Sequence, residues 1–341
     1  MEQYTIAVDA MGGDYGTKVT VPAALNALAQ HPNLRLILVG DQQELQAQLA
    51  AHPQNDRLQI QHATQVVSME DLPSVALRSK RDSSVRVAVN LVKEGRAQAC
   101  VSAGNTGALM AIARFVLKTI PGVDRPAIIT TLPTMLKDKE VRVLDLGANV
   151  DSSAENLFQF AIMGSLLCKA VDNIESPRVG VLNIGAEEMK GNEQVKEVAQ
   201  RLIDSEIINY IGYIEGDDIF SGKVDVVVCD GFVGNVALKT LEGSAKLFAH
   251  YLKQSYQYNF WSKIMALFSR PVFNRLKYAI DPGRRNGASL IGLRGIVIKS
   301  HGGADVAAFA HAITEAMIEV QVNVRERIEH QVAELLSRES V

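Results

Sequence analysis

The chain has 341 residues, 47% of them hydrophobic, so it is long enough to bury a large core. Its 35 Lys and Arg against 38 Asp and Glu give a net charge of -3. This balance excludes a disordered chain and argues against a general nucleic-acid binder, which needs a broad positive field. No stretch of about 18 uninterrupted apolar residues is present, and the amino terminus lacks the pattern of a signal peptide. We therefore expect a cytoplasmic protein that does not span a membrane.

Short, apolar, β-branched segments alternate along the chain with segments of helical periodicity. The predicted strands are 5–8, 34–39, 58–60, 99–101, 128–132, 141–144, 179–184, 224–229 and 296–298. The predicted helices are 19–28, 85–92, 157–167, 195–203 and 306–320. Such alternation favours an α/β fold of three layers, a largely parallel sheet flanked by helices. Because no linker or repeat interrupts the alternation of strands and helices, we predict a single large domain, 1–341. A division of this domain into two lobes stays open.

Glycine-containing turns follow many of the predicted strands. They occupy 9–14, 102–107, 145–149, 183–191, 230–235 and 300–305. We expect them to line one crevice, because ligands of open parallel sheets bind at the carboxyl ends of the strands. Backbone N–H groups at such turns suit phosphate, although glycine can equally serve only to turn the chain. Neither a dinucleotide motif nor a complete P-loop is present, so no nucleotide cofactor is predicted.

A few turn residues carry chemistry of their own. Lys190 is the main cation of the turns, and a charge there serves a bound anion, the alternative being a solvated loop lysine. His301 is the only histidine in a glycine turn and can donate a proton, with a structural role equally open. Cys229 ends a buried strand, where a cysteine is usually inert. Together with Cys100 and Cys168 it fits reduced thiols without metal-ligand spacing, so no metal is predicted.

The segment 243–280 differs in composition from the rest of the chain. It contains no Asp or Glu, six Lys or Arg, and nine of the 19 aromatic residues. Apolar residues in helical spacing predict an amphipathic hairpin, which we expect Pro271 to divide into two elements. A cationic, aromatic arm of this kind suits a membrane surface or an acidic protein partner, and a dimer interface is the alternative. Its candidate docking residues are Lys253, Trp261, Lys263, Ile264, Leu267, Phe268 and Arg270.

Taken in order, the turns closely resemble the fatty acyl-acyl-carrier-protein:phosphate acyltransferase family of bacterial phospholipid synthesis (PlsX). The resemblance is carried by residues 9–14, 101–108, 144–149, 183–191, 228–236 and 298–305. Small departures from the family pattern fall at Ala186, Val233, Gly303 and Ala304.

The resemblance implies a reversible reaction in which inorganic phosphate attacks the thioester of a long-chain acyl carrier protein. The products are acyl phosphate and the free carrier. It also implies a homodimer, a fold like that of phosphotransacetylases and isopropylmalate-type dehydrogenases, and no cofactor. Because phosphate is itself the nucleophile, no covalent enzyme intermediate is required. The docking segment would then serve the acidic carrier and an inner membrane surface, beside which acyl phosphate passes to a membrane glycerol-3-phosphate acyltransferase.

On this basis we expect Lys190, Asn235 and His301 to be catalytic. Lys190 would attract phosphate, and Asn235 would donate a hydrogen bond to phosphate or the oxyanion. His301 would assist the leaving thiolate or orient phosphate. The expected substrate-binding residues are Gly13, Asn105, Thr106, Gly107, Asn149, Gly231 and Gly234. The acidic residues Asp9, Asp145 and Asp230 are expected to brace the turns. Two alternatives stay open: a phosphotransacetylase-like enzyme that uses acyl-CoA, and a noncatalytic membrane-associated scaffold of lipid synthesis.

Overall fold

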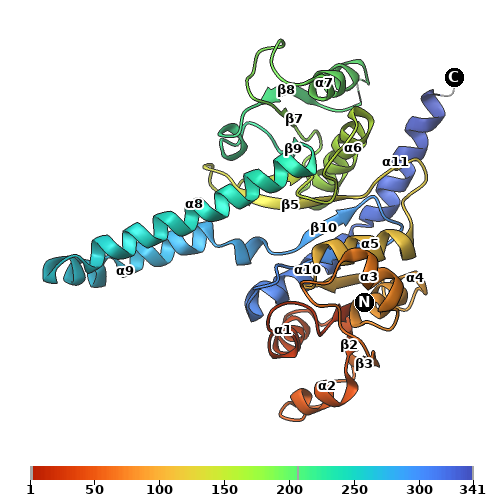
Figure 1. Cartoon of the computed structure of the whole chain (residues 1–341), viewed down its shortest axis with the longest axis vertical. Coiled ribbons are helices and arrows are strands. Elements are labelled where there is room, and N and C mark those ends of the chain that lie inside the picture. Colours follow the sequence, from red (N-terminus) through yellow and green to blue (C-terminus); the bar gives the residue numbers. More distant parts are fainter. Residues whose placement is uncertain (1–2, 206, 340–341) are drawn as a thin grey trace.

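The computed structural model describes residues 3–205 and 207–339. The fold is built on one 11-stranded sheet with the order β3-β2-β1-β4-β11-β10-β5-β6-β9-β7-β8 and with helices packed against it (Figure 1). The strands are β1 (Tyr4–Asp9), β2 (Leu34–Gly40), β3 (Leu58–His62), β4 (Ala99–Ser102), β5 (Ala127–Pro133), β6 (Glu140–Leu144), β7 (Val179–Leu182), β8 (Tyr210–Ile214), β9 (Val226–Val228), β10 (Ala288–Ile291) and β11 (Ile296–Lys299). This architecture confirms the predicted α/β fold class.

The helices include all five that the periodicity predicts. They are α1 (Thr17–Gln30), α2 (Gln42–Leu49), α3 (Pro73–Ser79), α4 (Ser84–Lys93), α5 (Thr106–Leu117), α6 (Ala154–Val171), α7 (Glu193–Ser205), α8 (Gly231–Gln257), α9 (Phe260–Ile280), α10 (Val306–Gln321) and α11 (Val324–Glu339), with short 3-10 turns at Asp218–Phe220 and Pro282–Arg285. The helices α2, α3, α5 and α11 and the strands β8 and β10 are additions to the predicted set.

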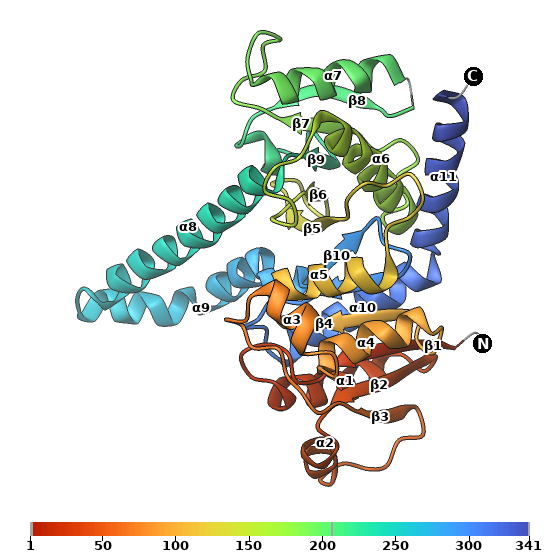
Figure 2. The same ribbon diagram turned by 45° about the vertical axis from the view of Figure 1, so that its right-hand side comes forward.

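Strand direction divides the sheet into two groups. Strands β3, β2, β1, β4 and β11 are mutually parallel, and so are β6, β9, β7 and β8. Between them, β10 pairs antiparallel with β11 and with β5, and β5 pairs antiparallel with β6. The two parallel groups therefore run in opposite senses. In Figure 2 the first group lies in the lower part of the molecule and the second in the upper part.

Alternating strand residues pack against helices on opposite faces of the sheet. In the first group, Ile6 and Val8 of β1 join a core cluster with α1 and α10, whereas Ala7 joins a cluster with α4 and α5. In the second group, Val226 and Val228 of β9 pack in a cluster with α6, α7 and α11. All five of these strand side chains are fully buried. The period-two alternation thus builds the three layers, with helices on both sides of the sheet.

The helices α8 and α9 form a hairpin that projects from the rest of the molecule (Figures 1 and 2). The turn lies at Tyr258 and Asn259, where the Asn259 side chain accepts a hydrogen bond from the Ser262 N–H at 2.8 Å and so caps α9. The predicted break at Pro271 is wrong, because Pro271 lies inside α9. Proline removes one N–H group, and on an exposed helix water can satisfy the carbonyl left without a donor.

Candidate active site

The turns that follow β1, β4 and β11 meet one another. The N–H of Asp14 donates to the carbonyl oxygen of Gly302 at 2.9 Å, which ties the first turn to the last. A Cβ atom on Gly12 would lie 2.8 Å from the Gly104 nitrogen, and one on Gly13, whose φ is +87°, would lie 2.9 Å from the Ala103 Cβ. Only glycine permits this approach and this backbone conformation. The backbones of these turns therefore pack closely together. We call the turns after β1, β4 and β11 the first turn group.

A buried polar cluster lies beneath the first turn group. The Asp9 carboxylate accepts a hydrogen bond from the Ser102 hydroxyl at 2.6 Å, and its other oxygen, Oδ1, has no partner among the described residues. Burial raises the pKa of Asp9. The Lys299 ammonium donates to the backbone oxygens of Ala103, at 3.4 Å, and Ser300. Asp9 and Lys299 thus place a carboxyl group and an amine against the first turn group.

Lys299 is a functional candidate that our reading of the sequence missed. It ends β11 and is only 9% exposed. Burial lowers its pKa to about 8, against the opposing effect of the carboxylates of Asp9 and Asp14, and the positive charge of Lys239 lowers it further. Lys239 lies on α8, so this part of the charge that acts on Lys299 comes from the helix that follows β9. A lysine that ends an otherwise apolar strand and precedes a glycine turn was the available signal.

His301 presents one ring nitrogen away from its own turn. The Gly303 N–H donates to His301 Nδ1 at 3.0 Å, and the His301 N–H donates to Asn286 Oδ1 at 2.9 Å. Because Nδ1 is an acceptor, the proton of the neutral ring lies on Nε2. The side chain is exposed. The geometry therefore makes Nε2 of His301 available as a hydrogen-bond donor.

The second turn group follows β6 and β9 and is held together by Asp145. Its carboxylate accepts hydrogen bonds from the backbone N–H groups of Ile128, Ala148 and Asn149 at 3.0, 3.0 and 2.7 Å, and from Asn149 Nδ2 at 2.8 Å. The Gly231 N–H donates to the Asn149 carbonyl oxygen at 2.9 Å. The buried Asp145 thus fixes the turn, as expected, and its burial raises its pKa.

The helix α8 begins directly against this turn. Asp230 caps the helix by accepting hydrogen bonds from the Phe232 and Val233 N–H groups at 2.9 and 3.0 Å. A Cβ atom on Gly234 would lie 1.9 Å from the Asp145 carbonyl oxygen. The contact between the turn and the first turn of α8 therefore requires glycine, and Asp230 has the bracing role that we expected for it.

The predicted residues Lys190 and Asn235 both have exposed side chains. Asn235 lies beside Gly147, at which a Cβ would be 3.4 Å from the Asn235 Cβ. Lys190 lies in the turn after β7, where the Asn183 side chain donates to the Lys190 carbonyl oxygen at 3.2 Å. Neither the Lys190 ammonium nor the Asn235 amide is engaged with the described part of the chain, so both can contact a ligand.

Two other predicted ligand-binding residues are engaged within the protein. Asn105 caps α5 by accepting from the Ala108 N–H at 3.0 Å, and its Nδ2 donates to the carbonyl oxygens of Met69 and Asp71 at 2.9 and 3.0 Å. Asn149 is buried and donates to the Pro126 carbonyl oxygen at 2.8 Å as well as to Asp145. A ligand could take hydrogen bonds from these two amides only by replacing existing partners.

The N-terminus of α5 packs against α3 and the segment before it. Thr106 and Gly107 are exposed, and a Cβ on Gly107 would lie 2.9 Å from Pro73 Cγ of α3.

The cysteines do not offer a nucleophile. Cys100, Cys168 and Cys229 are free thiols with buried side chains. Burial raises the pKa of Cys229, and the carboxylates of Asp230 and Asp145 raise it further. A thiol held in its neutral form is a poor nucleophile. Among residues 3–205 and 207–339, no group of three or more His, Cys, Asp or Glu side chains is arranged to hold a metal ion.

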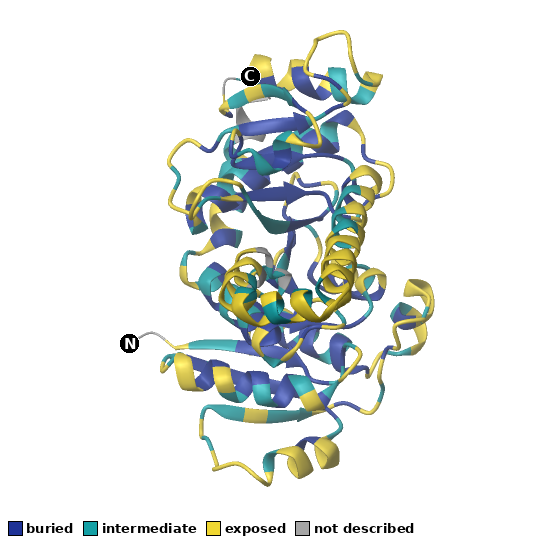
Figure 3. Ribbon diagram, turned by 90° about the vertical axis from the view of Figure 1, so that its left-hand side faces the viewer, coloured by how far each residue is buried: buried dark blue, intermediate teal, exposed yellow. Residues whose placement is uncertain are grey.

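Most of the hairpin of α8 and α9 is exposed (Figure 3). Many of its exposed residues are apolar. Trp261 and Phe268 are 70% and 73% exposed, and Leu267 is 67% exposed. Of the other predicted docking residues, Lys253, Lys263 and Arg270 are exposed and Ile264 is half-buried. The two helices are held together in part by an edge-to-face contact of the Tyr256 and Phe273 rings, whose centroids are 5.0 Å apart. In the described part of the chain, no helix is long and apolar enough to cross a membrane.

Comparison with known proteins places the chain among enzymes of lipid metabolism. The model of the fatty acid synthesis protein family matches residues 4–327. The chain is 56% identical to a phosphate acyltransferase of Legionella pneumophila (strain Paris) over 340 residues, which is 99% of both chains. It is 57% identical over 326 residues to a phosphate acyltransferase of Nitrosococcus oceani, covering 95% of each chain.

Solved structures show the same fold at low sequence identity. A phosphotransacetylase from Streptococcus pyogenes superposes with a TM-score of 0.63 and 17% identity, covering 96% of this chain and 94% of that one. A putative 4-hydroxythreonine-4-phosphate dehydrogenase from Salmonella typhimurium gives a TM-score of 0.53 at 15% identity, covering 93% of this chain and 99% of that one. The predicted relation to phosphotransacetylase and dehydrogenase folds is thereby confirmed.

Proposed function

The chain belongs to the fatty acid synthesis protein family and is an acyltransferase, and from this premise we propose that it transfers a long-chain fatty acyl group from acyl carrier protein to inorganic phosphate. The observation that supports the proposal is that cations and hydrogen-bond donors gather at the glycine turns. Among the described residues, all cysteine thiols are buried, so none is an accessible nucleophile. Such a site suits a reaction in which the bound anion is itself the nucleophile.

In the proposed reaction, a phosphate oxygen attacks the carbonyl carbon of the thioester. The carbonyl electron pair moves onto its oxygen, and stabilisation of this oxyanion is the main task of the protein. When the carbonyl re-forms, the carbon–sulfur bond breaks and the sulfur leaves with the bonding electrons and takes up a proton. The products are acyl phosphate and the free carrier thiol, and the reverse reaction uses the same groups.

The side chains described above divide these tasks. The exposed ammonium of Lys190 and the buried ammonium of Lys299 offset the negative charge of phosphate. Asn235 donates a hydrogen bond from its side-chain amide to phosphate or to the oxyanion. Gly231 and Gly234 hold the start of α8 against the Asp145 turn, because their N–H groups donate to the carbonyl oxygens of Asn149 and Asp230, each at 2.9 Å. His301 donates a hydrogen bond from Nε2 to the leaving sulfur. The N-terminus of α5, with Thr106 and Gly107, and the Gly13 turn complete the binding surface.

In the proposal, the exposed hairpin of α8 and α9 contacts the acyl carrier protein and the membrane. The segment 243–280 of this hairpin is acid-free and cationic, which favours an acidic carrier, and the exposed rings of the hairpin favour the headgroup region of an anionic membrane. In this account the enzyme acts as a homodimer at the inner membrane face. It delivers acyl phosphate to a membrane glycerol-3-phosphate acyltransferase for phospholipid synthesis.

A comparison of acyl donors tests the proposed reaction. Acyl carrier protein and CoA carrying the same acyl chain are each incubated with enzyme and inorganic phosphate, and acyl phosphate is measured. We expect a higher kcat/KM with the carrier, and a higher kcat/KM with CoA would support a phosphotransacetylase-like enzyme instead. Lys190→Ala should raise the KM for phosphate, whereas Lys196→Ala on α7 should leave it unchanged. Wild-type turnover in Lys190→Ala would refute the role of Lys190.

Sedimentation with vesicles tests the membrane contact. We expect the wild-type protein to bind vesicles that contain phosphatidylglycerol, and the double variant Trp261→Ser, Phe268→Ser to bind them less. Phe115→Ser is the control, because Phe115 is an exposed ring, 53% accessible, on α5 and outside the hairpin. Equal sedimentation of all three proteins would show that the hairpin does not contact lipid.

A further inference from the structure

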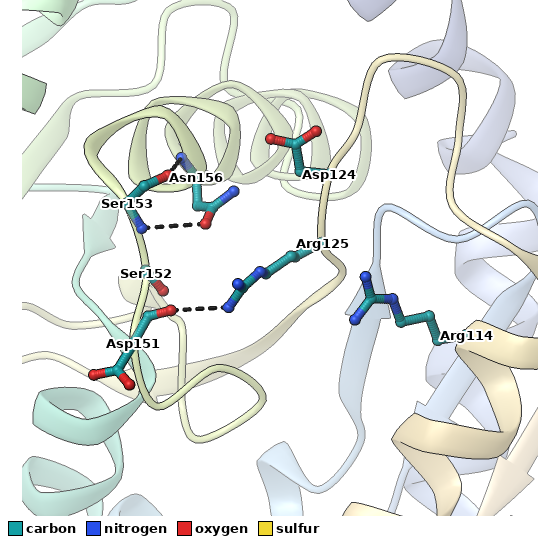
Figure 4. Close-up of a pocket in the computed structure, with 7 residues that line it drawn as sticks. All are labelled: Arg114, Asp124, Arg125, Asp151, Ser152, Ser153 and Asn156. Atoms are coloured by element: carbon teal, nitrogen blue, oxygen red, sulfur yellow. Dashed lines mark hydrogen bonds between the residues drawn. The ribbon is translucent and has the colours of Figure 1, made fainter.

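A pocket of about 560 Å³ lies between α5 and the start of α6, outside the set of residues that our sequence reading selected (Figure 4). It is lined by Arg114 of α5, by Asp124 and Arg125 of the segment before β5, and by residues 151–153 and Asn156 at the start of α6. Small-molecule sites in proteins span about 300–1,000 Å³. The pocket is therefore large enough for a ligand that is more than a single ion.

Two arginines supply positive charge to this pocket. Arg125 is held in place by a hydrogen bond from its Nη1 to the Asp151 carbonyl oxygen at 2.9 Å. The Arg114 guanidinium forms no ion pair or side-chain hydrogen bond with the described residues, and Figure 4 shows it extended toward the pocket beside Arg125. The carboxylates of Asp124 and Asp151 also belong to the lining. In Figure 4 that of Asp151 points away from Arg125, and that of Asp124 lies toward α6.

A buried hydroxyl group without a partner lies in the same lining. Ser152 is 9% exposed, and its Oγ is a buried atom that has no hydrogen-bond partner among the described residues. Figure 4 shows this oxygen on the side of the loop that faces Arg125. A buried polar group without a partner costs free energy, which a ligand oxygen that accepts its hydrogen bond would recover.

The start of α6 adds backbone donors beside Ser152. Ser153 caps the helix by accepting from the Asn156 N–H at 3.1 Å, and the Asn156 side chain accepts in return from the Ser153 N–H at 3.1 Å. The cap takes the N–H of Asn156, which leaves those of Ala154 and Glu155 at the N-terminal end of this 18-residue helix, where the helix dipole favours an anion. Arginines, an unpartnered hydroxyl and a helix N-terminus together match the oxygens of a phosphate group.

The pocket adjoins the second turn group. Asn149 joins the two, because its side chain donates to the carbonyl oxygen of Pro126, the residue after Arg125, while its own carbonyl oxygen accepts from Gly231 at the start of α8. Asn149 thus connects the segment that carries Arg125 to the start of α8. This position suits a group that belongs to one of the two substrates.

We propose that the pocket formed by Arg114, Arg125 and Ser152 binds a phosphate group of a substrate, an inference that rests on the proposed function for the identity of that substrate. Two sources share this chemistry. One is inorganic phosphate, and the other is the phosphodiester that attaches the thioester-bearing arm to acyl carrier protein. Arg114 and Arg125 contact the phosphate oxygens, and the Ser152 hydroxyl donates to one of them.

The test measures equilibrium binding and not turnover. Its result therefore does not depend on whether the enzyme forms acyl phosphate. Isothermal titration calorimetry with inorganic phosphate, with carrier bearing its arm, and with carrier lacking the arm is compared between wild type and the double variant Arg114→Gln, Arg125→Gln. Arg96→Gln is the control, because Arg96 is an exposed arginine outside the pocket. We expect the double variant to weaken binding by more than about tenfold for one of the two phosphate sources.

Weaker binding of inorganic phosphate alone would assign the pocket to that substrate. Loss of the difference between the two forms of carrier would assign it to the phosphodiester. Unchanged binding of all three ligands would overturn the proposal. Ser152→Ala provides a second, milder variant. It should weaken binding of the same ligand without lowering the urea midpoint, because it removes a hydroxyl that has no partner among the described residues. Unchanged affinity in this variant would remove Ser152 from the site.

Discussion

The contact between α8 and the Asp145 turn can be tested with two glycines of one helix. Alanine normally stabilises an exposed helix position relative to glycine by about 0.5–1 kcal/mol. At Gly243 a Cβ atom meets nothing within 4 Å, so Gly243→Ala should gain this amount. At Gly234 it would lie 1.9 Å from the Asp145 carbonyl oxygen and 2.9 Å from Cys229 Sγ. Gly234→Ala must therefore displace the backbone of α8 or of the turn.

The turn cannot yield easily, because the Asp145 N–H donates to the Cys229 carbonyl oxygen at 2.9 Å and its carboxylate is fully engaged. Overpacking that forces a backbone shift costs about 1–3 kcal/mol, so we expect Gly234→Ala to lower the free energy of unfolding by about 3 kcal/mol. Urea denaturation followed by circular dichroism measures both variants. Equal stabilisation by the two substitutions would mean that α8 does not pack on the turn as described.

Further predictions concern charged groups. Because the pKa of Lys299 is about 8, the KM for phosphate should rise as the pH increases through 8, and Lys299→Arg, which stays charged, should weaken this rise; an unchanged profile would exclude Lys299 from phosphate binding. Burial raises the pKa of Glu319 from 4.5 to about 8, so stability should fall as the pH rises from 4.5 through 8. Glu319→Gln should reduce this fall in the urea midpoint, with burial of the neighbouring Glu315 also raising its pKa, and a parallel fall in both proteins would contradict the assignment. Asp172→Asn leaves Arg142, which is 8% exposed, without the carboxylate that binds it through two hydrogen bonds of 2.6 Å. It should cost about 3 kcal/mol in urea unfolding, whereas Asp138→Asn in an exposed pair should cost no more than about 1 kcal/mol; equal costs would contradict the difference in burial.

The strand and helix pattern predicted the fold class well, because strands buried on both faces leave a strong signal in sequence. The strand β10 was missed because it has only four residues, Ala288–Ile291, with no clear alternation. Because β10 was not predicted, the reversal of strand direction at β10 and β5 was not predicted either. The glycine turns were expected along a single parallel edge, and they instead follow strands that run in opposite senses.

The site was predicted only in part, because side-chain engagement depends on tertiary contacts. Asn105 and Asn149 have the residue type of ligand donors, yet both amides are bonded within the protein. Lys299 ends an apolar strand, which marks it as a candidate, but the burial of its amine near Asp9 depends on tertiary contacts. Arg114 and Arg125 lie on different elements and share a pocket with Ser152 only in the folded chain. By contrast, the hairpin was evident from composition, because its charge and ring content are local properties.

A single-turnover experiment tests the central claim, that phosphate attacks the thioester directly. Enzyme is mixed with acyl carrier protein carrying a long acyl chain, with and without inorganic phosphate, and both free carrier thiol and acyl phosphate are measured over time. The account predicts equal amounts of the two products with phosphate, and no thiol release without it. Thiol release in proportion to enzyme without phosphate would reveal an acyl-enzyme intermediate, and failure to form acyl phosphate in its presence would contradict the proposed reaction.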